Sequence, residues 1–399
     1  MKKQEMKRHC MIVHGPYPHT ETRVEREAQA LIRYGHEVDV ICLKDSPDEP
    51  SFAIADGVNV HRLPVQRDKR RGLFGQLLEY LSFFVLAFFK VNELYNKRKY
   101  GVVEVHNLPD FLVFAALWPK MRGARVILNI HDVMPEFYAA RFKKDMNSLP
   151  VRLVRWQEAI SCRFADHVIT VTEPWRQSLI ERGVPAEKVS VVMNVANNQI
   201  FNGGEAGQPH DRESRFALIY HGTLAQRYGI DLLLRAVAIA RKAIPEIHLT
   251  VHGRGEYYEN LVELAKELGL EKEVSFSTGL LPISDLPAFI RRADLGVVPY
   301  RRDVFTDGIL PTKLMEYTAL HVPVIAARTP AIEAYFDEDM VHYVPAEDVE
   351  ALAAAIVYLH EHRGRLNELA AKSNRFNERF AWENIAQGYS SLVERLPAS

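Results

Sequence analysis

Residues 307–327 carry the side chains whose types and spacing point most clearly to chemistry. Pro311 precedes a helical pattern that begins at Thr312 or Lys313, and one turn further on stands a single carboxylate, Glu316. A helix start presents unpaired backbone N–H groups and a partial positive charge, which together favour a phosphate group. Lys313 would add a mobile cation, and Glu316 could accept hydrogen bonds from sugar hydroxyls. The alternative is an ordinary helix with a surface lysine and an exposed glutamate.

A second loop suited to phosphate follows the strand predicted at residues 216–220. Gly222 would let a ligand approach the backbone closely, and Thr223 offers both a hydroxyl and an N–H group. Arg227 offers a planar fork that matches two phosphate oxygens. The alternative is a strand–turn–helix connection whose arginine points to water.

Histidines recur where predicted strands end. His14, His106, His131 and His221 occupy comparable positions, and Asp132 follows the third of them. A single histidine at such a place is more often a core or capping residue. Four of them favour a functional site.

Composition bounds the class of protein. The 399 residues are 47% hydrophobic and 25% charged, which is typical of a soluble globular chain with room for two domains. Lys and Arg (50) nearly balance Asp and Glu (51), so no overall basic field indicates nucleic acid. The three cysteines show no metal-site spacing, and the N-terminus lacks the pattern of a signal peptide. We therefore expect a cytoplasmic protein.

Apolar strands alternate with helical stretches along the chain, and the alternation restarts after a polar stretch at residues 202–214. This pattern predicts two doubly wound α/β domains with parallel sheets, and ligands beyond the carboxyl ends of the strands in the cleft between them. The predicted strands are residues 10–14, 37–43, 101–105, 125–130, 167–171 and 189–193, then 216–220, 247–252, 274–277, 295–299 and 322–326. A final helix at residues 381–395 could pack against either domain.

Several motifs together resemble the retaining family-four glycosyltransferases with the GT-B fold, in their bacterial polysaccharide-building branch. In the second half these are GTLAQRYGIDLLLRA, HGRGE, ADLGVVPY, PTKLMEYTALHVPVIA and FAWEN, and in the first half ETRVEREAQALIRYGHEVDVICL, EVHNLPDFLVFAAL, ILNIHDVMPEFY and ADHVITVTE. The resemblance implies two facing Rossmann-like domains. Residues 1–200 would bind the acceptor, residues 201–380 the nucleotide sugar, and residues 381–399 would form a C-terminal helix.

The resemblance also implies a donor site. Glu316 matches the second glutamate of the family's E-x7-E pair, which is expected to hold the ribose. The first glutamate would fall at Gly308, so the adjacent Asp307 is the candidate replacement. Thr223 and Tyr228 stand where many relatives have a basic pair. Arg227 is therefore the expected cation for the diphosphate, with Lys313 second, beside Gly222, Pro311 and Thr312.

On the acceptor side, His131 matches the histidine that the family uses near the anomeric carbon. Asp132 and His106 would shape the acceptor site. Arg23 lies in a segment that resembles the branch's R-V-x-R-E-A motif and could meet an anionic acceptor; the alternative is a solvated helix charge. Because cations and a helix end can neutralise a diphosphate, we expect no metal and no cofactor besides the sugar nucleotide.

An apolar run at residues 77–91 follows the basic stretch at residues 67–71. It is shorter than the roughly 20 residues that span a bilayer. One interpretation is a buried core helix. The other is an interfacial helix whose basic lead-in touches anionic lipid at the inner face of the membrane, which would suit a polyprenyl-diphosphate-linked acceptor.

The sequence thus predicts a hexosyltransferase that moves a sugar from a nucleotide diphosphate sugar to a glycan or lipid-linked acceptor in cell-surface polysaccharide synthesis, with retention of configuration. Two alternatives remain: a nucleotide-sugar epimerase of the same fold, which would need acid and base carboxylates around the sugar, and a nucleotide-sugar-binding protein without turnover.

Overall fold

The computed structural model describes residues 7–18, 21–65, 72–201, 215–277, 279 and 281–396. The chain divides into two compact units. The first contains Met1–Asn194 together with Glu383–Ser399, and the second contains Val195–Trp382. The polar stretch at residues 202–214 and the basic stretch at residues 67–71 lie outside the described residues.

The first unit is built on an eight-stranded sheet with the order β3-β4-β2-β1-β5-β6-β7-β8. Its neighbouring strands run parallel, except that β3 is antiparallel to β4. The strands are β1 (Lys7–Pro16), β2 (His36–Leu43), β3 (Phe52–Ala55), β4 (Val58–Leu63), β5 (Val102–His106), β6 (Arg125–Ile130), β7 (His167–Thr170) and β8 (Val189–Val191).

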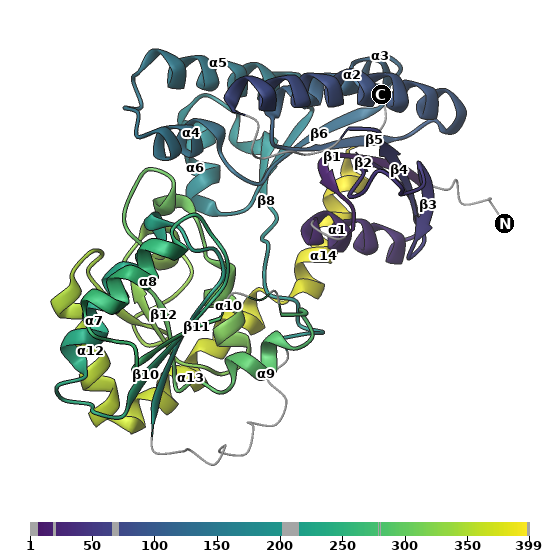
Figure 1. Ribbon diagram of the computed structural model, residues 1–399. Coiled ribbons are helices and arrows are strands. Elements are labelled where there is room, and N and C mark those ends of the chain that lie inside the picture. The colour runs from purple at the N-terminus through teal and green to yellow at the C-terminus, as the bar shows by residue number, and fades with distance from the viewer. Residues whose placement is uncertain are drawn as a thin grey trace. The chain divides into compact units, whose positions relative to one another are not determined.

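Helices cover both faces of this sheet. In Figure 1, α2 and α5 lie on one face, while α1 and α14 lie on the other. The helices are α1 (Thr22–Arg33), α2 (Leu73–Arg98), the 3-10 helix η1 (Asp110–Ala116), α3 (Leu117–Met121), α4 (Met134–Phe142), α5 (Leu149–Phe164), α6 (Glu173–Glu181), η2 (Ala186–Lys188) and α14 (Trp382–Arg395). The C-terminal helix α14 therefore returns to the first unit, where the Tyr389 hydroxyl donates a hydrogen bond to Glu104 on β5.

The second unit holds a six-stranded parallel sheet with the order β11-β10-β9-β12-β13-β14. Its strands are β9 (Phe216–His221), β10 (Ile247–His252), β11 (Val274–Ser277), β12 (Leu295–Val298), β13 (Val324–Ala327) and β14 (His342–Val344). The helices are η3 (Gln226–Tyr228), α7 (Ile230–Ala240), α8 (Tyr258–Glu267), α9 (Leu286–Ile290), η4 (Thr306–Gly308), α10 (Thr312–Ala319), α11 (Pro330–Glu333), α12 (Val349–Glu361) and α13 (Arg363–Arg379).

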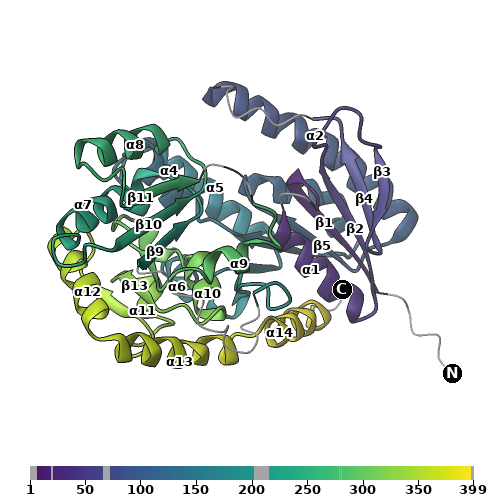
Figure 2. The same ribbon diagram turned by 60° about the horizontal axis from the view of Figure 1, so that its bottom comes forward.

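The core of this second unit forms where α7 and α12 pack together against the sheet (Figure 2). Leu233, Val237 and Ile356 are among its fully buried side chains, together with Leu249 of β10. Continuous apolar strands between helical segments are what a parallel sheet covered on both faces requires. The two parallel sheets confirm the predicted doubly wound architecture.

The predicted strands are all present, although their ends shift by up to three residues. Three strands were not predicted: the interior strand β4, and the short strands β3 and β14 at the sheet edges. β3 is an edge strand whose residues alternate between exposed and half-buried, and β14 has three residues. Such short edge strands bury little apolar surface, so their hydrophobic pattern is weak.

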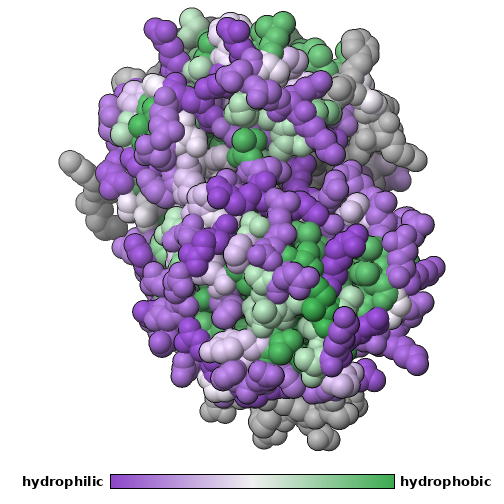
Figure 3. Space-filling model, turned by 90° about the vertical axis from the view of Figure 1, so that its left-hand side faces the viewer, coloured by the Kyte–Doolittle hydropathy of each residue, from purple (hydrophilic) through white to green (hydrophobic). Residues whose placement is uncertain are grey.

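The run at residues 77–91 belongs to the 26-residue helix α2. Its inner side is buried through Phe83, Ala87 and Val91, but Leu81, Val85 and other apolar side chains on its outer side are exposed. The core-helix prediction therefore holds for one side only. Among the described residues, no helix combines the length and apolarity needed to cross a bilayer. By contrast with this outer side, the face of the molecule in Figure 3 is covered mostly by hydrophilic residues.

Candidate functional site

Glu316 of α10 is anchored to the end of β9. Its Oε2 lies 2.6 Å from Nε2 of His221, and Nδ1 of His221 lies 3.0 Å from the hydroxyl of Tyr317. Because a carboxylate only accepts hydrogen bonds, Nε2 carries the ring proton and Nδ1 accepts from the Tyr317 hydroxyl. These two hydrogen bonds hold Oε2 of Glu316 in place. Its other oxygen, Oε1, belongs to a side chain that is 17% exposed and can meet a ligand.

Lys313 is not the mobile cation that the sequence predicted. Its Nζ donates a 2.9 Å hydrogen bond to the hydroxyl of Tyr300 and lies 4.8 Å from the ring centre of Tyr220 and 5.2 Å from that of Tyr228. Burial lowers the pKa of Lys313 to about 8. The three aromatic rings replace water around the ammonium group, so the cation stays fixed at one point of the site.

Gly222 leaves room for the side chain of Lys313. It has φ +116°, and a Cβ there would lie 3.2 Å from Cε of Lys313. The loop after β10 leaves still less room, because a Cβ on Gly253 would lie 1.8 Å from the carbonyl oxygen of Gly222, and one on Gly255 would lie 1.9 Å from that of Leu224. The two glycine loops therefore pack backbone against backbone beside Lys313.

Thr223 and Arg227 lie on the outer part of the same loop. Thr223 is exposed, and Arg227, on η3, is half-buried with its guanidinium carbon 5.4 Å from the ring centre of Phe305. In the part of the chain that the structure describes, no carboxylate forms an ion pair with Arg227. Its charge is therefore available to an anion, and phosphate binding by Arg227 stays a prediction.

The four remaining donor-site candidates lie just before and at the start of α10. Asp307, on η4, accepts two hydrogen bonds of 2.9 and 2.7 Å from Arg302. Gly308 and Pro311 are buried, whereas Thr312, the first residue of α10, is exposed. The Arg302 fork neutralises Asp307, so a ligand hydroxyl would have to share the carboxylate with that guanidinium.

In the first unit, Arg23 is not a solvated helix charge. It is buried, and its guanidinium donates to Glu27 (3.0 Å), to the side-chain oxygen of Asn129 (2.9 Å) and to the carbonyl of Val192 (3.1 Å). These bonds tie α1 to β6 and to the segment after β8. Since its donors already serve protein acceptors, we expect Arg23 to position neighbouring groups.

His106 and His131 form an imidazole pair at the ends of β5 and β6. Nδ1 of His106 lies 3.1 Å from Nε2 of His131. Burial lowers the pKa of His106 to about 4 and that of His131 well below its usual value. Both rings are therefore neutral at pH 7, and one donates a hydrogen to the other.

Asn107 holds the loop that follows His131. Its side-chain oxygen accepts the backbone N–H of His131 at 2.8 Å, and its amide nitrogen donates to the carbonyl of Asp132 (2.7 Å) and to the carboxylate of Asp110 (2.8 Å). His131 and Asp132 are half-buried, whereas His106 is fully buried. Of the acceptor-side candidates, His131 and Asp132 are thus the ones that a ligand can reach.

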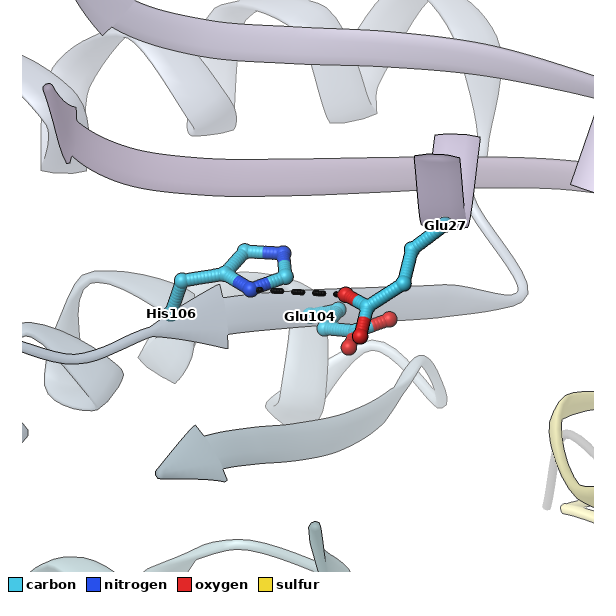
Figure 4. A group of neighbouring side chains, drawn as sticks. All are labelled: Glu27, Glu104 and His106. Carbon is cyan, nitrogen blue, oxygen red and sulfur yellow. Dashed lines mark ion pairs between the residues drawn. The ribbon is translucent and has the colours of Figure 1, made fainter. Parts of the chain in front are cut away.

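The buried cluster of Glu27, Glu104 and His106 is the strongest metal candidate among the described residues, with ligand atoms within 4.8 Å of one another (Figure 4). Asn129 donates to both carboxylates, while Arg23 also donates to the first and His9 and Tyr389 to the second. A cation would have to displace these donors beside a guanidinium. We therefore interpret the cluster as a structural hydrogen-bond network.

Opposite pKa shifts within this network support that interpretation. Burial raises the pKa of Glu27 to about 7 despite the nearby Arg23. Burial also raises the pKa of Glu104, but the hydrogen bond from His9 and the neighbouring imidazoles outweigh it and hold the value at about 2. Because the two pKa values lie so far apart, Glu27 is protonated and neutral over most of the acidic range while Glu104 is charged. The two adjacent carboxyls can therefore both be buried without two negative charges facing each other there.

A cavity of about 460 Å³ lies elsewhere in the first unit. Its walls come from the segments after β2 and β4, including Lys44 and Val65, and from Leu78, Glu79 and Ser82 of α2. His14, predicted as a strand-end residue, is instead inside β1 and faces this helix, with its Nε2 3.2 Å from Glu79.

The structure brings the predicted donor residues together within the second unit and His106, His131 and Asp132 within the first. Sequence reasoning missed the residues that hold them, namely Asn107, Asn129, His221 as the partner of Glu316, and Tyr300. His221 and Asn107 had a visible signal, their place at a strand end. Asn129 and Tyr300 are ordinary core residues in the sequence.

Two family models match successive parts of the chain. Residues 20–194 match the family model described as glycosyl transferase 4-like domain, and residues 215–362 match that of glycosyl transferases group 1. The chain is 23% identical to a chitobiosyldiphosphodolichol beta-mannosyltransferase of Debaryomyces hansenii over 71% of this chain and 65% of that protein. A shorter match, at 34% identity, covers 33% of this chain and 35% of a GDP-mannose-dependent alpha-(1-6)-phosphatidylinositol monomannoside mannosyltransferase of Mycolicibacterium smegmatis.

Among solved structures, the fold is similar to that of sucrose-phosphate synthase from Thermosynechococcus elongatus. The TM-score is 0.77 at 20% identity, and the match covers 98% of this chain and 99% of that one. At 20% identity this structural similarity shows only the fold, which is GT-B.

Proposed function

We propose that this chain, which belongs to the GT-B-fold glycosyltransferases of the 4-like and group 1 families, moves a hexose from a nucleotide diphosphate sugar to a glycan or lipid-linked acceptor. The observation that carries the proposal is the site at the end of β9. There a carboxylate held by His221, a buried lysine and a glycine loop converge within one unit.

The donor side follows from these contacts. Glu316 accepts hydrogen bonds from the ribose, while Gly222, Thr223 and the first N–H groups of α10 approach the diphosphate. Arg227 and Lys313 supply positive charge. Pro311 and Thr312 shape the helix start, and Asp307 and Gly308 lie toward the donor sugar.

Transfer requires stabilisation of the diphosphate as the glycosidic bond breaks. Fixed cations and backbone N–H groups stabilise the charge that develops on the leaving oxygen without reorganising at that moment. The caged position of Lys313 suits this role, because its charge already lies at the site before the donor arrives. We propose that these groups do the work without a metal, and that the configuration at the anomeric carbon is retained as in the family.

On the acceptor side we assign His131 to the transfer step and Asp132 to acceptor binding. His106 and Arg23 position them from the interior. Two relatives are named as mannosyltransferases of chitobiosyldiphosphodolichol and of phosphatidylinositol monomannoside, and these names support an acceptor carried on a lipid. We propose cell-surface polysaccharide synthesis at the cytoplasmic side of the membrane as the setting.

The test is to incubate the purified protein with a panel of UDP-, GDP- and ADP-sugars and to follow the release of free sugar and nucleoside diphosphate. Slow hydrolysis of one donor, which is lost in Glu316→Ala, is the expected result. Conversion of the sugar to its epimer, or binding without any release, would overturn the proposal.

A further inference from the structure

The outer side of α2 is apolar to an unusual degree. Seven residues between positions 77 and 89 are exposed, and six of them are large hydrophobic side chains: Leu77 (46% exposed), Leu78 (49%), Leu81 (43%), Val85 (47%), Leu86 (36%) and Phe89 (66%). The seventh is Ser82. Glu79, which carries the only charge in this stretch, is buried against His14. Monomeric soluble proteins seldom leave so continuous an apolar strip in water.

Helix α5 repeats the pattern. Leu149, Leu153 and Trp156 are 68%, 58% and 63% exposed, at a spacing that places them on one side of the helix. The charged residue exposed among them is Arg152, while the one acid of the helix, Glu158, is buried against Arg182. Apolar and aromatic side chains interleaved with arginine are the composition of a surface that meets lipid headgroups.

The two helices belong to one face of the first unit. Both pack on η1, through a ring contact of Phe84 with Phe111 from α2 and of Phe114 with Phe164 from α5. Figure 1 shows both on the same side of the sheet. The inner side of α2 is buried, so this helix offers its outer side to a surface while its inner side stays packed.

We propose that the exposed apolar sides of α2 and α5 form a docking surface for an anionic lipid bilayer. The docking surface extends the proposed function, and only the statement that a lipid-linked acceptor is used there rests on that function. Basic residues lie close to these helices along the chain: Lys143 and Lys144 in the segment between α4 and α5, and Lys90 and Lys97 on α2 after Phe89. The two α2 lysines already hold the nearby Glu93, so no unpaired acid there repels an anionic headgroup.

The cavity beside α2 makes a bilayer the better occupant than a protein. Leu78 and Ser82 belong both to its wall and to the exposed strip, and Lys44 also lines it. The hydrocarbon tail of an amphiphile in the bilayer could lie along the strip while its polar headgroup enters the cavity. A lipid-linked acceptor has such a tail and such a headgroup.

The experiment is flotation of the full chain with vesicles of phosphatidylglycerol and phosphatidylethanolamine, compared with vesicles of phosphatidylcholine. We expect flotation with the anionic vesicles and at least a tenfold loss of the bound fraction in Leu81→Glu/Val85→Glu and in Leu153→Glu/Trp156→Glu. Ile54→Glu is the matched control, because Ile54 is 68% exposed in the same unit but lies on β3. It should float like the wild type.

Three outcomes would overturn the inference: no flotation of the wild type, flotation that both double variants retain, or a soluble dimer that the α2 variant disrupts in light scattering. Donor hydrolysis in the second unit reports separately on folding and on the proposed function. The double variants should keep it. Hydrolysis absent from a wild-type protein that floats would remove the proposed function and leave the docking surface standing.

Discussion

At the scale of single residues, the proposed recognition of the donor depends most on the bond between His221 and Glu316. It orients the carboxylate before the ligand arrives, so that less conformational freedom is lost on binding. Glu316→Ala should raise the KM for the donor about tenfold to a hundredfold, the effect of losing a hydrogen bond to a charged group. Glu316→Gln, which keeps the shape, should lose less. An unchanged KM in the alanine variant would contradict the assignment.

The caged Lys313 predicts a pH effect on donor binding. Its pKa of about 8 lies below the usual 10.5, so the free protein loses this cation as the pH rises through 8. The affinity for the donor should therefore fall above about pH 8. Lys313→Met should bind more weakly at pH 7 and show no such fall, as measured by titration of the nucleotide at pH 6.5 to 9.5.

The lowered pKa of Lys313 also determines whether the protein gains or loses stability as the pH rises. Between about pH 8 and pH 10.5 the unfolded chain keeps a proton on this lysine that the folded chain has lost. The contribution of Lys313 to the free energy of unfolding therefore rises with pH in that window. Binding and stability should thus respond in opposite directions, which separates a local effect of the lysine from general alkaline unfolding.

His131 should affect turnover more than binding. His131→Ala is expected to lower kcat by about a hundredfold, a typical effect of losing a group that acts in the transition state, with little change in the KM for the donor. Because burial keeps the pKa of His131 well below its usual value, kcat should show no histidine titration between pH 5.5 and 7.5. A slope in that range that disappears in the variant would refute the neutral ring.

The sequence could indicate Glu316, Arg227 and Gly222 because each belongs to a motif with a mechanism of its own. It could not indicate that aromatic rings surround Lys313, since Tyr220 on β9, Tyr228 on η3 and Tyr300 after β12 meet only when these segments fold together. The burial of Arg23 was missed for a similar reason. An amphipathic helix pattern does not show that an asparagine on β6 will accept its guanidinium.

At the scale of elements, the two glycine loops after β9 and β10 pack against each other and form one side of the proposed donor site. Gly253→Ala should lower the stability by about 1 to 3 kcal/mol through strain at its φ of +149°. It should also weaken donor binding, because the new Cβ would displace the carbonyl of Gly222. Thermal unfolding and donor titration measure the two effects.

Gly269→Ala is the matched control for that variant. Gly269 also has a positive φ, of +62°, but a Cβ there meets nothing within 4 Å. It should lose stability and keep the wild-type affinity for the donor. If both variants bind equally well, the close packing of the two loops is not needed for recognition.

Elements with strong periodicity could be predicted from the sequence, and weak ones could not. Strands β6, β10 and β11 have the predicted bounds. The clearest of them is β6, in which all residues after Arg125 are buried, as expected for a strand covered on both faces. The edge strands β3 and β14 lack this signal. For α2 the apolar run showed that a helix was present, but not that its inner side is buried and its outer side is exposed.

At the scale of the whole molecule, the chain is two α/β units with the C-terminal helix returned to the first. Alternation of strands and helices was sufficient to predict the two sheets. The returned helix α14 makes a buried bond from Tyr389 to Glu104, which are 285 residues apart. No local pattern reports a contact of that range, which is why the sequence left the place of this helix open.

Removal of divalent metal is the prediction that belongs to this scale. If arginine, lysine and backbone N–H groups neutralise the diphosphate, EDTA should leave the rate of donor hydrolysis unchanged. A rate that falls at least tenfold in EDTA and returns with Mg²⁺ or Mn²⁺ would show that a metal carries part of that charge.

The most direct test of the central claim is titration calorimetry of the wild-type protein with UDP, GDP, ADP and their common sugars in the presence of EDTA. The proposed site predicts heat for at least one nucleotide and its sugars, reduced or absent in Glu316→Ala and Arg227→Ala. No heat with any of them would contradict the claim that this chain binds a sugar nucleotide.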